Sequence, residues 1–178
     1  MMGYRMKKNQ LVTTKSTSLI LGKSKSLMGI TKKILEAKSK ELTTHTGITV
    51  IGDLMWEKES REMNWDDAME YAKNLRLGGY DDWRLPNREE LEDVVRLCGG
   101  EPVEYDDDNY DEITDNNLAR KAYQSSYKEK SFTSNYYWSS TTHADYASRA
   151  WIVFFDFGET YGNVKTRTNY VRCVRAVY

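Results

Sequence analysis

The order of helical and strand patterns predicts an α+β fold for residues 48–178. Two helical segments with capping residues, 64–79 and 87–100, come first. Runs rich in β-branched and aromatic residues follow at 136–141, 149–157 and 170–177, and they indicate strands. Because the strands cluster after the helices instead of alternating with them, we expect a separate sheet rather than a parallel α/β arrangement.

A short strand pair is expected before the first helix. Ile48–Ile51 and Leu54–Trp56 flank Gly52-Asp53, a dipeptide typical of tight hairpin turns. Asn64 is the expected N-cap of the first helix, and Gly78 is expected to end it. Helical spacing predicts the buried face of this helix, which consists of Ala68, Tyr71, Ala72 and Leu75.

The second helix is predicted from a capping box, with Asn87 as the N-cap and Glu90 three residues later. Its inward face is expected to contain Leu91, Val94, Val95 and Cys98. Residues 101–135 lose periodicity, so we expect a long loop with one helical turn near Leu118–Tyr123. The stretch GETYGN, 158–163, is interpreted as a turn between the late strands.

Charge divides the chain into two parts. Residues 1–41 carry ten basic and two acidic side chains, a net of +8, whereas residues 42–178 carry 16 and 25, a net of -9. In the first part, apolar pairs recur every seven residues from Ile20-Leu21 to Ile34-Leu35, with most lysines outside that stripe. We therefore predict a basic amphipathic helical segment over 1–47 and a separate domain over 48–178. Oligomerisation or partner docking is the favoured role of the segment, and packing on its own domain or on a membrane surface are the alternatives.

The composition also bounds location and partners. No apolar run approaches the roughly eighteen residues that cross a bilayer, so we expect no transmembrane segment. No secretory signal is recognisable, and we expect a cytoplasmic protein. Lysines without interleaved aromatics or arginines do not favour a nucleic-acid partner.

The acidic stretch 104–117 is the main candidate for a metal site. Aligned from Asp106, an EF-hand loop would need glycine where Asp111 stands and glutamate where Asn117 stands. A solvated acidic loop is therefore expected, with a looser Ca²⁺ site as the alternative, and no cofactor is predicted. Cys98 and Cys173 are expected to be buried thiols rather than a disulfide, and no catalytic residue is assigned.

The stretch GGYDDWRLPNREEL, 78–91, joins the two predicted helices. We expect Asp81 or Asp82 to neutralise Arg84 there, as an internal ion-pair clip. Each tryptophan lies in or beside a predicted element and is expected in the core or half-buried. The residues predicted to build the fold are Trp56, Trp65, Asp81, Asp82, Trp83, Arg84, Pro86, Trp138, Trp151, Arg172 and Cys173.

Five stretches of the chain carry a family resemblance: GDLMWEKE, NWDDAMEYAKNLRLGGYDDWRLPNREEL, YWSSTT, AWIVFFDFG and YVRCVR. In order and spacing they resemble the DUF1566 family, also called the Lcl C-terminal domain, over about residues 48–178. The resemblance implies a C-type-lectin-like fold, in which two helices flank a small, twisted, mostly antiparallel sheet and long loops carry ligand specificity. Formylglycine-generating enzymes and the variable proteins of diversity-generating retroelements are thought to share that fold.

The resemblance implies binding more than catalysis. Formylglycine-generating enzymes use a close pair of cysteines near the C-terminus with copper, and only Cys173 lies in that region here. We therefore predict a non-catalytic recognition module for a protein or glycan ligand, displayed by the N-terminal helix. An oxidase of the formylglycine-generating type and a structural scaffold subunit are the alternatives. Because tyrosine and arginine on loops give large, adaptable contact areas, the predicted ligand contacts are Tyr105, Tyr110, Tyr127, Tyr136, Tyr146, Tyr161 and Arg167.

Overall fold

The computed structural model describes residues 30–34, 47–105 and 117–177. The chain divides into two compact units, Met1–Glu41 and Leu42–Tyr178. In the first unit, residues 30–34 are helical, and Ile30 and Ile34 of the predicted apolar stripe are exposed. The remainder of the predicted amphipathic helix lies outside the described residues.

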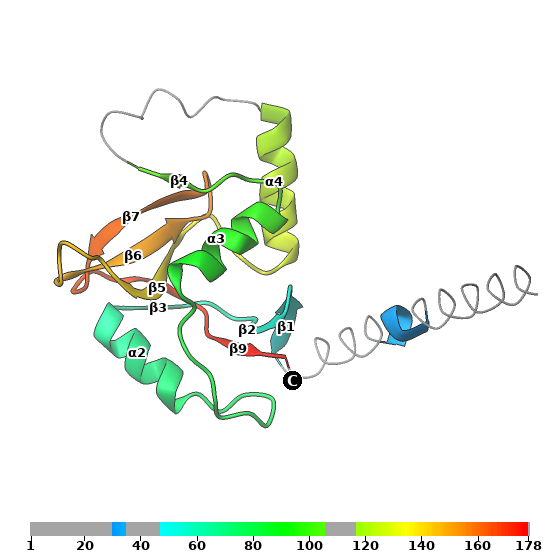
Figure 1. Ribbon diagram of the computed structural model, residues 1–178, viewed down its shortest axis with the longest axis horizontal. Coiled ribbons are helices and arrows are strands. Elements are labelled where there is room, and N and C mark those ends of the chain that lie inside the picture. The colour runs from blue at the N-terminus through cyan, green and yellow to red at the C-terminus, as the bar shows by residue number, and fades with distance from the viewer. Residues whose placement is uncertain (1–29, 35–46, 106–116, 178) are drawn as a thin grey trace, which may run out of the picture. The chain divides into compact units, whose positions relative to one another are not determined.

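The second unit has the predicted α+β class, but its strands form two sheets where the sequence predicted a single one (Figure 1). The strands of the smaller sheet have the order β1-β2-β9, and those of the larger sheet the order β3-β8-β5-β6-β7-β4. Neighbouring strands are antiparallel except in the β4–β7 and β5–β8 pairs, which are parallel. The strands are β1 Ile48–Ile51, β2 Leu54–Glu57, β3 Arg61–Met63, β4 Val103–Glu104, β5 Tyr136–Thr142, β6 Arg149–Phe154, β7 Glu159–Val164, β8 Asn169–Val171 and β9 Val174–Ala176. The helices of this unit are α2 Trp65–Asn74, α3 Arg88–Leu97 and α4 Asn117–Glu129.

The predicted hairpin at the start of the second unit is confirmed. Ile51 pairs with Leu54 across a two-residue turn, where Gly52 has a φ of 59°. Glycine adopts that left-handed backbone without the steric cost of a Cβ atom. On its other side β2 pairs with β9, so the first hairpin and the last strand share one sheet.

Side-chain caps start α2 and α3 where the sequence predicts them. The Asn64 side chain accepts a hydrogen bond from the backbone N–H of Asp67 at 2.9 Å. At α3, Asn87 accepts from the Glu90 N–H at 2.8 Å, and the Glu90 carboxylate accepts from the Asn87 N–H at 2.8 Å, which completes the predicted capping box.

The predicted stop of α2 at Gly78 is wrong. The helix ends at Asn74, because the backbone at Leu75 turns extended, with ψ of 130°. Gly78 has a φ of 64° and lies in the following turn, where Leu77 and Tyr80 exchange backbone hydrogen bonds of 3.2 and 3.1 Å. The glycine therefore serves a tight turn between the helices rather than a helix C-terminus.

The hydrophobic core occupies both faces of the larger sheet. Along β6, Ala150 and Ile152 pack with α2, whereas Val153 and the next apolar residue, Phe155, pack with α3 and α4. Alternate side chains of a strand point to opposite faces. Consequently α2 covers one face of the sheet, and α3 with α4 covers the other, as can be followed in Figure 1.

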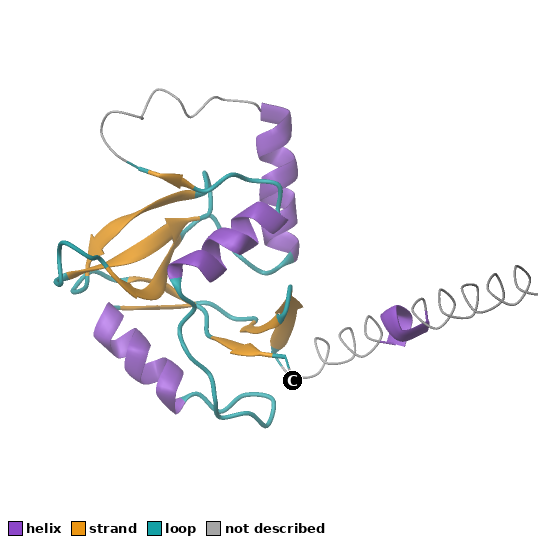
Figure 2. Ribbon diagram, viewed as in Figure 1, coloured by secondary structure: helices purple, strands orange, loops and turns teal. Residues whose placement is uncertain are grey.

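Two segments expected to be irregular are regular elements (Figure 2). The loop predicted over 101–135 contains the thirteen-residue helix α4, whose polar sequence masks a pair of core residues one turn apart, Tyr123 and Tyr127. The turn predicted at 158–163 is largely strand β7. Its turn-like glycine, Gly162, is required by packing, since a Cβ atom there would lie 2.7 Å from the His143 ring.

The predicted ion-pair clip is wrong in its partners. Arg84 pairs with Glu90, at 2.6 Å between Nη2 and Oε1, and not with Asp81 or Asp82. Asp82 instead pairs with Arg175 of β9, at 2.7 Å. The Arg84 guanidinium donates two hydrogen bonds to the capping glutamate of α3, from Nη1 to Oε2 at 2.8 Å and from Nη2 to Oε1 at 2.6 Å.

The five tryptophans confirm the expected core and half-buried positions. Trp56, Trp83 and Trp138 are buried, and Trp65 and Trp151 are partly exposed. Three indole N–H groups donate to backbone carbonyls: Trp65 to Ser139 at 2.8 Å, Trp83 to Leu77 at 3.2 Å and Trp138 to Met63 at 3.1 Å. The Trp65 bond joins α2 to β5, the Trp138 bond joins β5 to β3, and the Trp83 bond lies within the connection between α2 and α3.

The last predicted structural residues are also buried. Pro86 is enclosed, and its carbonyl accepts from the Ser140 N–H at 2.7 Å. Arg172 is fully buried, donates to the carbonyls of Glu57 and Lys130 at 2.6 and 3.0 Å, and lies over the Phe132 ring at 4.1 Å. Its guanidinium therefore joins β2 to the chain after α4.

Candidate functional site

An aromatic face lies on the side of the larger sheet that also carries α2. We define it as Tyr136 of β5, Phe154 of β6, Glu159 and Tyr161 of β7, and Tyr105 directly after β4. The strand register places these side chains on one surface, because Tyr136 and Glu159 both pair with Phe154, and Tyr161 pairs with Ile152, which packs against α2.

The rings of the aromatic face form a connected series, in which each ring lies against the next. The Tyr136 ring stacks on Phe154 with centroids 4.3 Å apart, and it meets Tyr161 edge-on at 5.8 Å. Tyr161 in turn lies 6.1 Å from the Tyr105 ring. Three tyrosines predicted as ligand contacts, Tyr105, Tyr136 and Tyr161, are thus neighbours on three strands of the sheet or next to them.

The aromatic face is accessible and can donate hydrogen bonds. Tyr136 is 37% exposed, and the other rings are partly exposed. Burial and the neighbouring Tyr136 hydroxyl raise the pKa of the Tyr161 phenol, with smaller contributions from the nearby Glu159 and Tyr105. The phenol therefore stays neutral, so the face offers stacking surfaces together with O–H donors and acceptors.

Glu159 is the carboxylate of the aromatic face. Partial burial, followed by the negative charge of Asp156, raises its pKa. The charge of Asp156 is already matched, since Arg120 pairs with it at 2.7 Å and Gln124 donates to it at 2.8 Å. Over the described ranges 47–105 and 117–177, no basic side chain pairs with Glu159.

The other four predicted ligand contacts are not part of the aromatic face. Tyr127 is wrong as a loop contact, because it is fully buried on α4 against Tyr123 and Phe155. Tyr146, 56% exposed, lies beside His143 at 5.1 Å in the β5–β6 connection. Arg167 is exposed between β7 and β8, and Tyr110 lies outside the described residues.

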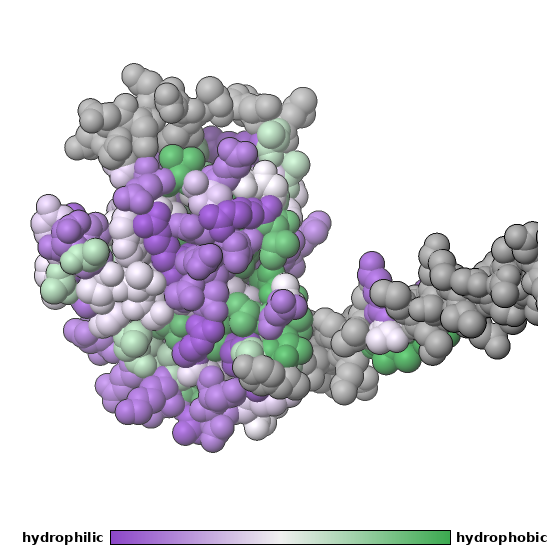
Figure 3. Space-filling model, in the orientation of Figure 1, coloured by the Kyte–Doolittle hydropathy of each residue, from purple (hydrophilic) through white to green (hydrophobic). Residues whose placement is uncertain are grey.

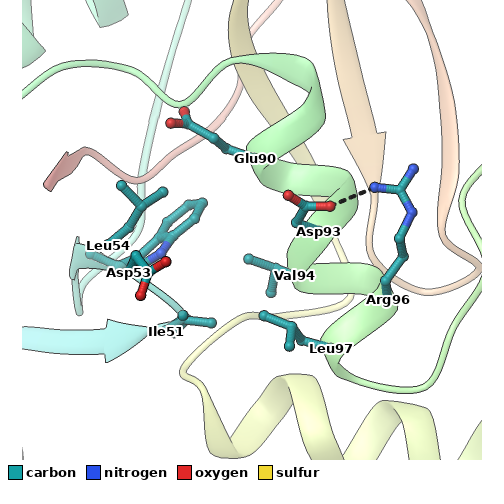
Figure 4. A pocket seen from close by; sticks show the side chains of 10 residues that line it. Ile51, Asp53, Leu54, Glu90, Asp93, Val94, Arg96 and Leu97 are labelled. Atoms are coloured by element: carbon teal, nitrogen blue, oxygen red, sulfur yellow. Dashed lines mark hydrogen bonds and ion pairs between the residues drawn. The ribbon is translucent and has the colours of Figure 1, made fainter.

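A second surface feature is a hollow of about 460 Å³ between the β1–β2 hairpin and α3 (Figure 4). The sequence did not predict this hollow. The large apolar and aromatic side chains that line it are Ile51, Leu54, Trp56, Val94 and Leu97, and apolar residues gather on the face shown in Figure 3. Of the charges around it, Asp93 pairs with Arg96 at 2.6 Å and Glu90 with Arg84. Helical spacing marks Val94 and Leu97 as neighbours, but the approach of the hairpin depends on the tertiary structure.

A family comparison covers nearly all of this second unit. A model of the Lcl C-terminal domain matches residues 50–175, from β1 to β9. The chain belongs to the Lcl C-terminal domain family. A comparison with curated proteins finds no match. Every described residue of the aromatic face and of the hollow lies within the Lcl C-terminal domain match.

The two cysteines of this Lcl C-terminal domain are free thiols in the core. Cys98 belongs to the cluster beneath α3 and α4, and Cys173 to the cluster beneath α2. Burial is the main cause that raises the pKa of each thiol, so both stay protonated near neutral pH.

Metal and membrane features can be stated for the described residues. Within ranges 30–34, 47–105 and 117–177, no three His, Cys, Asp or Glu side chains gather in a metal-binding group. None of the helices in the same ranges has the length and apolar character needed to cross a bilayer.

Proposed function

We propose that this Lcl C-terminal domain is a non-catalytic recognition module, and that the aromatic face is the surface that binds its protein or glycan ligand. The C-type-lectin-like fold implied by the resemblance stays an expectation. Stacking on planar rings suits both ligand types, because a tyrosine contributes a large contact area and a hydroxyl at a low cost in side-chain entropy.

The convergence of Tyr105, Tyr136 and Tyr161 carries this proposal. The three tyrosines come from positions 31 and 25 residues apart, yet their rings form a connected series with Phe154. The sequence predicts all three tyrosines as ligand contacts. Exposed aromatic clusters of this kind mark interaction sites more often than scattered apolar residues do.

The buried thiols favour binding over the oxidase alternative. Copper or covalent chemistry at cysteine uses the thiolate form. The raised pKa values of Cys98 and Cys173 and their places in separate clusters disfavour that form and its pairing. We therefore retain recognition as the proposed function of the domain.

The test compares three full-length variants in two parallel assays, binding to a glycan array and pull-down of proteins from a cell lysate. Tyr136→Ala and Tyr161→Ala each remove one ring of the aromatic face. We expect each to weaken capture of the retained ligand by about tenfold, since a ring in the centre of an interface contributes on the order of 1–2 kcal/mol. Circular dichroism and a thermal melt check that each variant is folded.

Tyr146→Ala is the matched control, because Tyr146 is an exposed tyrosine outside the aromatic face. It is expected to leave capture unchanged. If folded Tyr136→Ala and Tyr161→Ala proteins retained the ligand while Tyr146→Ala lost it, the binding surface would lie on the β5–β6 connection, and the aromatic face would be the wrong site.

A further inference from the structure

We infer that the aromatic face binds a cationic side chain, a lysine or arginine presented by a polypeptide partner, with Glu159 as its counter-ion. This inference rests on the recognition function proposed above and specifies the chemistry of the ligand. It follows from the ring geometry, from the carboxylate placed among the rings and from the charge around them.

The rings supply a surface that attracts cations. The faces of aromatic rings carry negative electrostatic potential, and a cation within about 6 Å of a ring centroid is stabilised by it. Tyr136 and Phe154 lie nearly parallel, with 26° between their planes, whereas Tyr161 meets Tyr136 at 74°. Rings at two orientations surround a small cationic group better than a flat stack does.

The same fold already uses this contact for its own arginines. The Arg120 guanidinium lies 4.0 Å from the Phe157 centroid, and the Arg175 guanidinium lies 3.8 Å from that of Tyr80. In both cases a carboxylate completes the site, Asp156 for Arg120 and Asp82 for Arg175. An aromatic ring beside a carboxylate is therefore an arrangement that holds a cation at two places in this protein.

On the aromatic face the ring and the carboxylate are present, and the cation is missing among the described residues. Glu159 pairs across the strands with Phe154 and along the parallel β4 with Val103, so it points to the same surface as the rings. Partial burial destabilises its charge, which a bound cation would relieve. A neutral or anionic ligand would leave that carboxylate without compensation.

The surrounding charge favours a basic partner over an acidic one. Residues 42–178 have a net charge of -9. The segment 106–116, which follows Tyr105 directly in the sequence, contains six acidic side chains and no basic one. An anionic approach to this surface is therefore repelled and a cationic approach is accelerated.

The width of the surface favours a polypeptide over a free amine. From β5 to β4 the aromatic face spans four adjacent strands, which is about 14 Å at the usual strand spacing. A peptide covers that distance with about four extended residues. A segment of this length can place one basic side chain at Glu159 while its neighbours contact the rings of Tyr136 and Tyr105.

The experiment measures fluorescence anisotropy of the full-length chain with a labelled octapeptide of alternating lysine and glycine. The same peptide with every lysine acetylated, and a peptide with glutamate in place of lysine, serve as probes without the positive charge. We expect the lysine peptide to bind at least about tenfold more tightly than the acetylated one. The glutamate peptide should show no saturable binding.

Three substitutions at two positions distinguish the contribution of the carboxylate from that of the ring. Glu159→Gln keeps the shape of the side chain and should lower the affinity for the lysine peptide by about tenfold. Tyr136→Ala removes the ring and should also lower this affinity by about tenfold. Tyr136→Phe keeps the ring, so its affinity for the lysine peptide should stay within about twofold of that of the unmodified chain.

Glu89→Gln is the control for net charge. Glu89 is exposed on α3, which covers the opposite face of the sheet, so this variant loses one negative charge away from the site. It should change the affinity by less than about twofold. Equal weakening by Glu89→Gln and Glu159→Gln, or equal binding of the lysine and acetylated peptides, would overturn the assignment of a cationic ligand.

The two proposals fail in different ways. A ligand whose capture is lost in Tyr136→Ala but unchanged in Glu159→Gln would overturn the cation assignment and leave the recognition surface in place. If both variants retained the ligand, the binding site would lie outside the aromatic face, and both proposals would be wrong.

Discussion

The carboxylate of Asp82 and the guanidinium of Arg175 form a two-point ion pair between residues 93 positions apart in the sequence. Nε donates to Oδ1 at 2.7 Å and Nη2 donates to Oδ2 at 3.1 Å. The Arg175 side chain is only 6% exposed, and it also lies over the Tyr80 ring. The pair fastens the connection between α2 and α3 to the last strand.

Replacing Asp82 should destabilise the domain. Asp82→Asn removes the carboxylate charge that accepts two hydrogen bonds from the enclosed Arg175 guanidinium, and we expect a loss of about 1–2 kcal/mol in the free energy of unfolding. Urea denaturation measures this loss. Asp81→Asn is the matched control, since Asp81 is exposed and should change stability by less than about 0.5 kcal/mol. Equal effects of the two variants would contradict the pairing.

Acid should weaken the same region. Hydrogen bonding to Arg175 holds the pKa of Asp82 below its ordinary value of 3.8. For Glu90, burial opposes ionisation, but hydrogen bonds from Arg84 and from the Asn87 N–H lower the pKa overall. Both groups therefore contribute stability that is present above their unfolded-state pKa values and is lost as pH falls through the folded-state values.

Melting temperatures between pH 7 and pH 3 check this dependence. The unmodified chain should lose stability most steeply below about pH 4.5, where the unfolded chain takes up protons first. The double variant Asp82→Asn, Glu90→Gln should start less stable and show a shallower decline. A decline of the same slope in both proteins would show that other groups govern acid unfolding.

Two adjacent glycines should respond differently to alanine. Gly78 and Gly79 both have positive φ, 64° and 82°, so each substitution carries backbone strain of about 1 kcal/mol. A Cβ atom on Gly78 would also overlap with Cδ1 of the buried Ile48, whereas one on Gly79 would have nothing within 4 Å. We expect Gly78→Ala to be the more destabilising by about 1 kcal/mol or more in thermal or urea unfolding. Equal losses would contradict the close packing of Gly78 on Ile48.

Removing residues 1–41 tests the role predicted for the basic segment. The remaining unit, Leu42–Tyr178, is compact by itself, so we expect its circular dichroism to keep the features of an α+β fold. If the segment mediates self-association, the shortened chain should form particles with fewer copies than the full chain does. Light scattering measures this number as the particle mass divided by the mass of one copy. An unchanged number of copies would rule out the oligomerisation role and leave docking to another protein, packing on its own domain or binding to a membrane surface.

Local chemistry explains which elements were predictable. The caps at Asn64 and Asn87 and the turn at Gly52-Asp53 involve residues at most three positions apart, so short stretches of sequence specify them. Only one turn of helix α4, near Leu118–Tyr123, was predicted, because only Tyr123 and Tyr127 mark its buried side within a polar sequence. Strand β7 was missed because its glycine resembles a turn signal, although packing against His143 requires it.

The candidate site shows the same division. Composition and loop position selected Tyr105, Tyr136 and Tyr161, but the same criteria also selected Tyr127, which is buried. Glu159 cannot be singled out from the sequence, because nothing in its neighbourhood along the chain distinguishes it from other acids. Its position among the rings depends on the pairing of β7 with β6 and β4.

The α+β class, the family, the caps of α2 and α3 and the core or half-buried positions of the tryptophans follow from the sequence alone, because they depend on local spacing and on the hydrophobicity of single side chains. The partners of Arg84 and Asp82 and the gathering of the aromatic face follow only from the folded structure. Strand register and helix placement bring together residues that are distant along the chain, and the energy of an ion pair or ring contact depends on that distance in space.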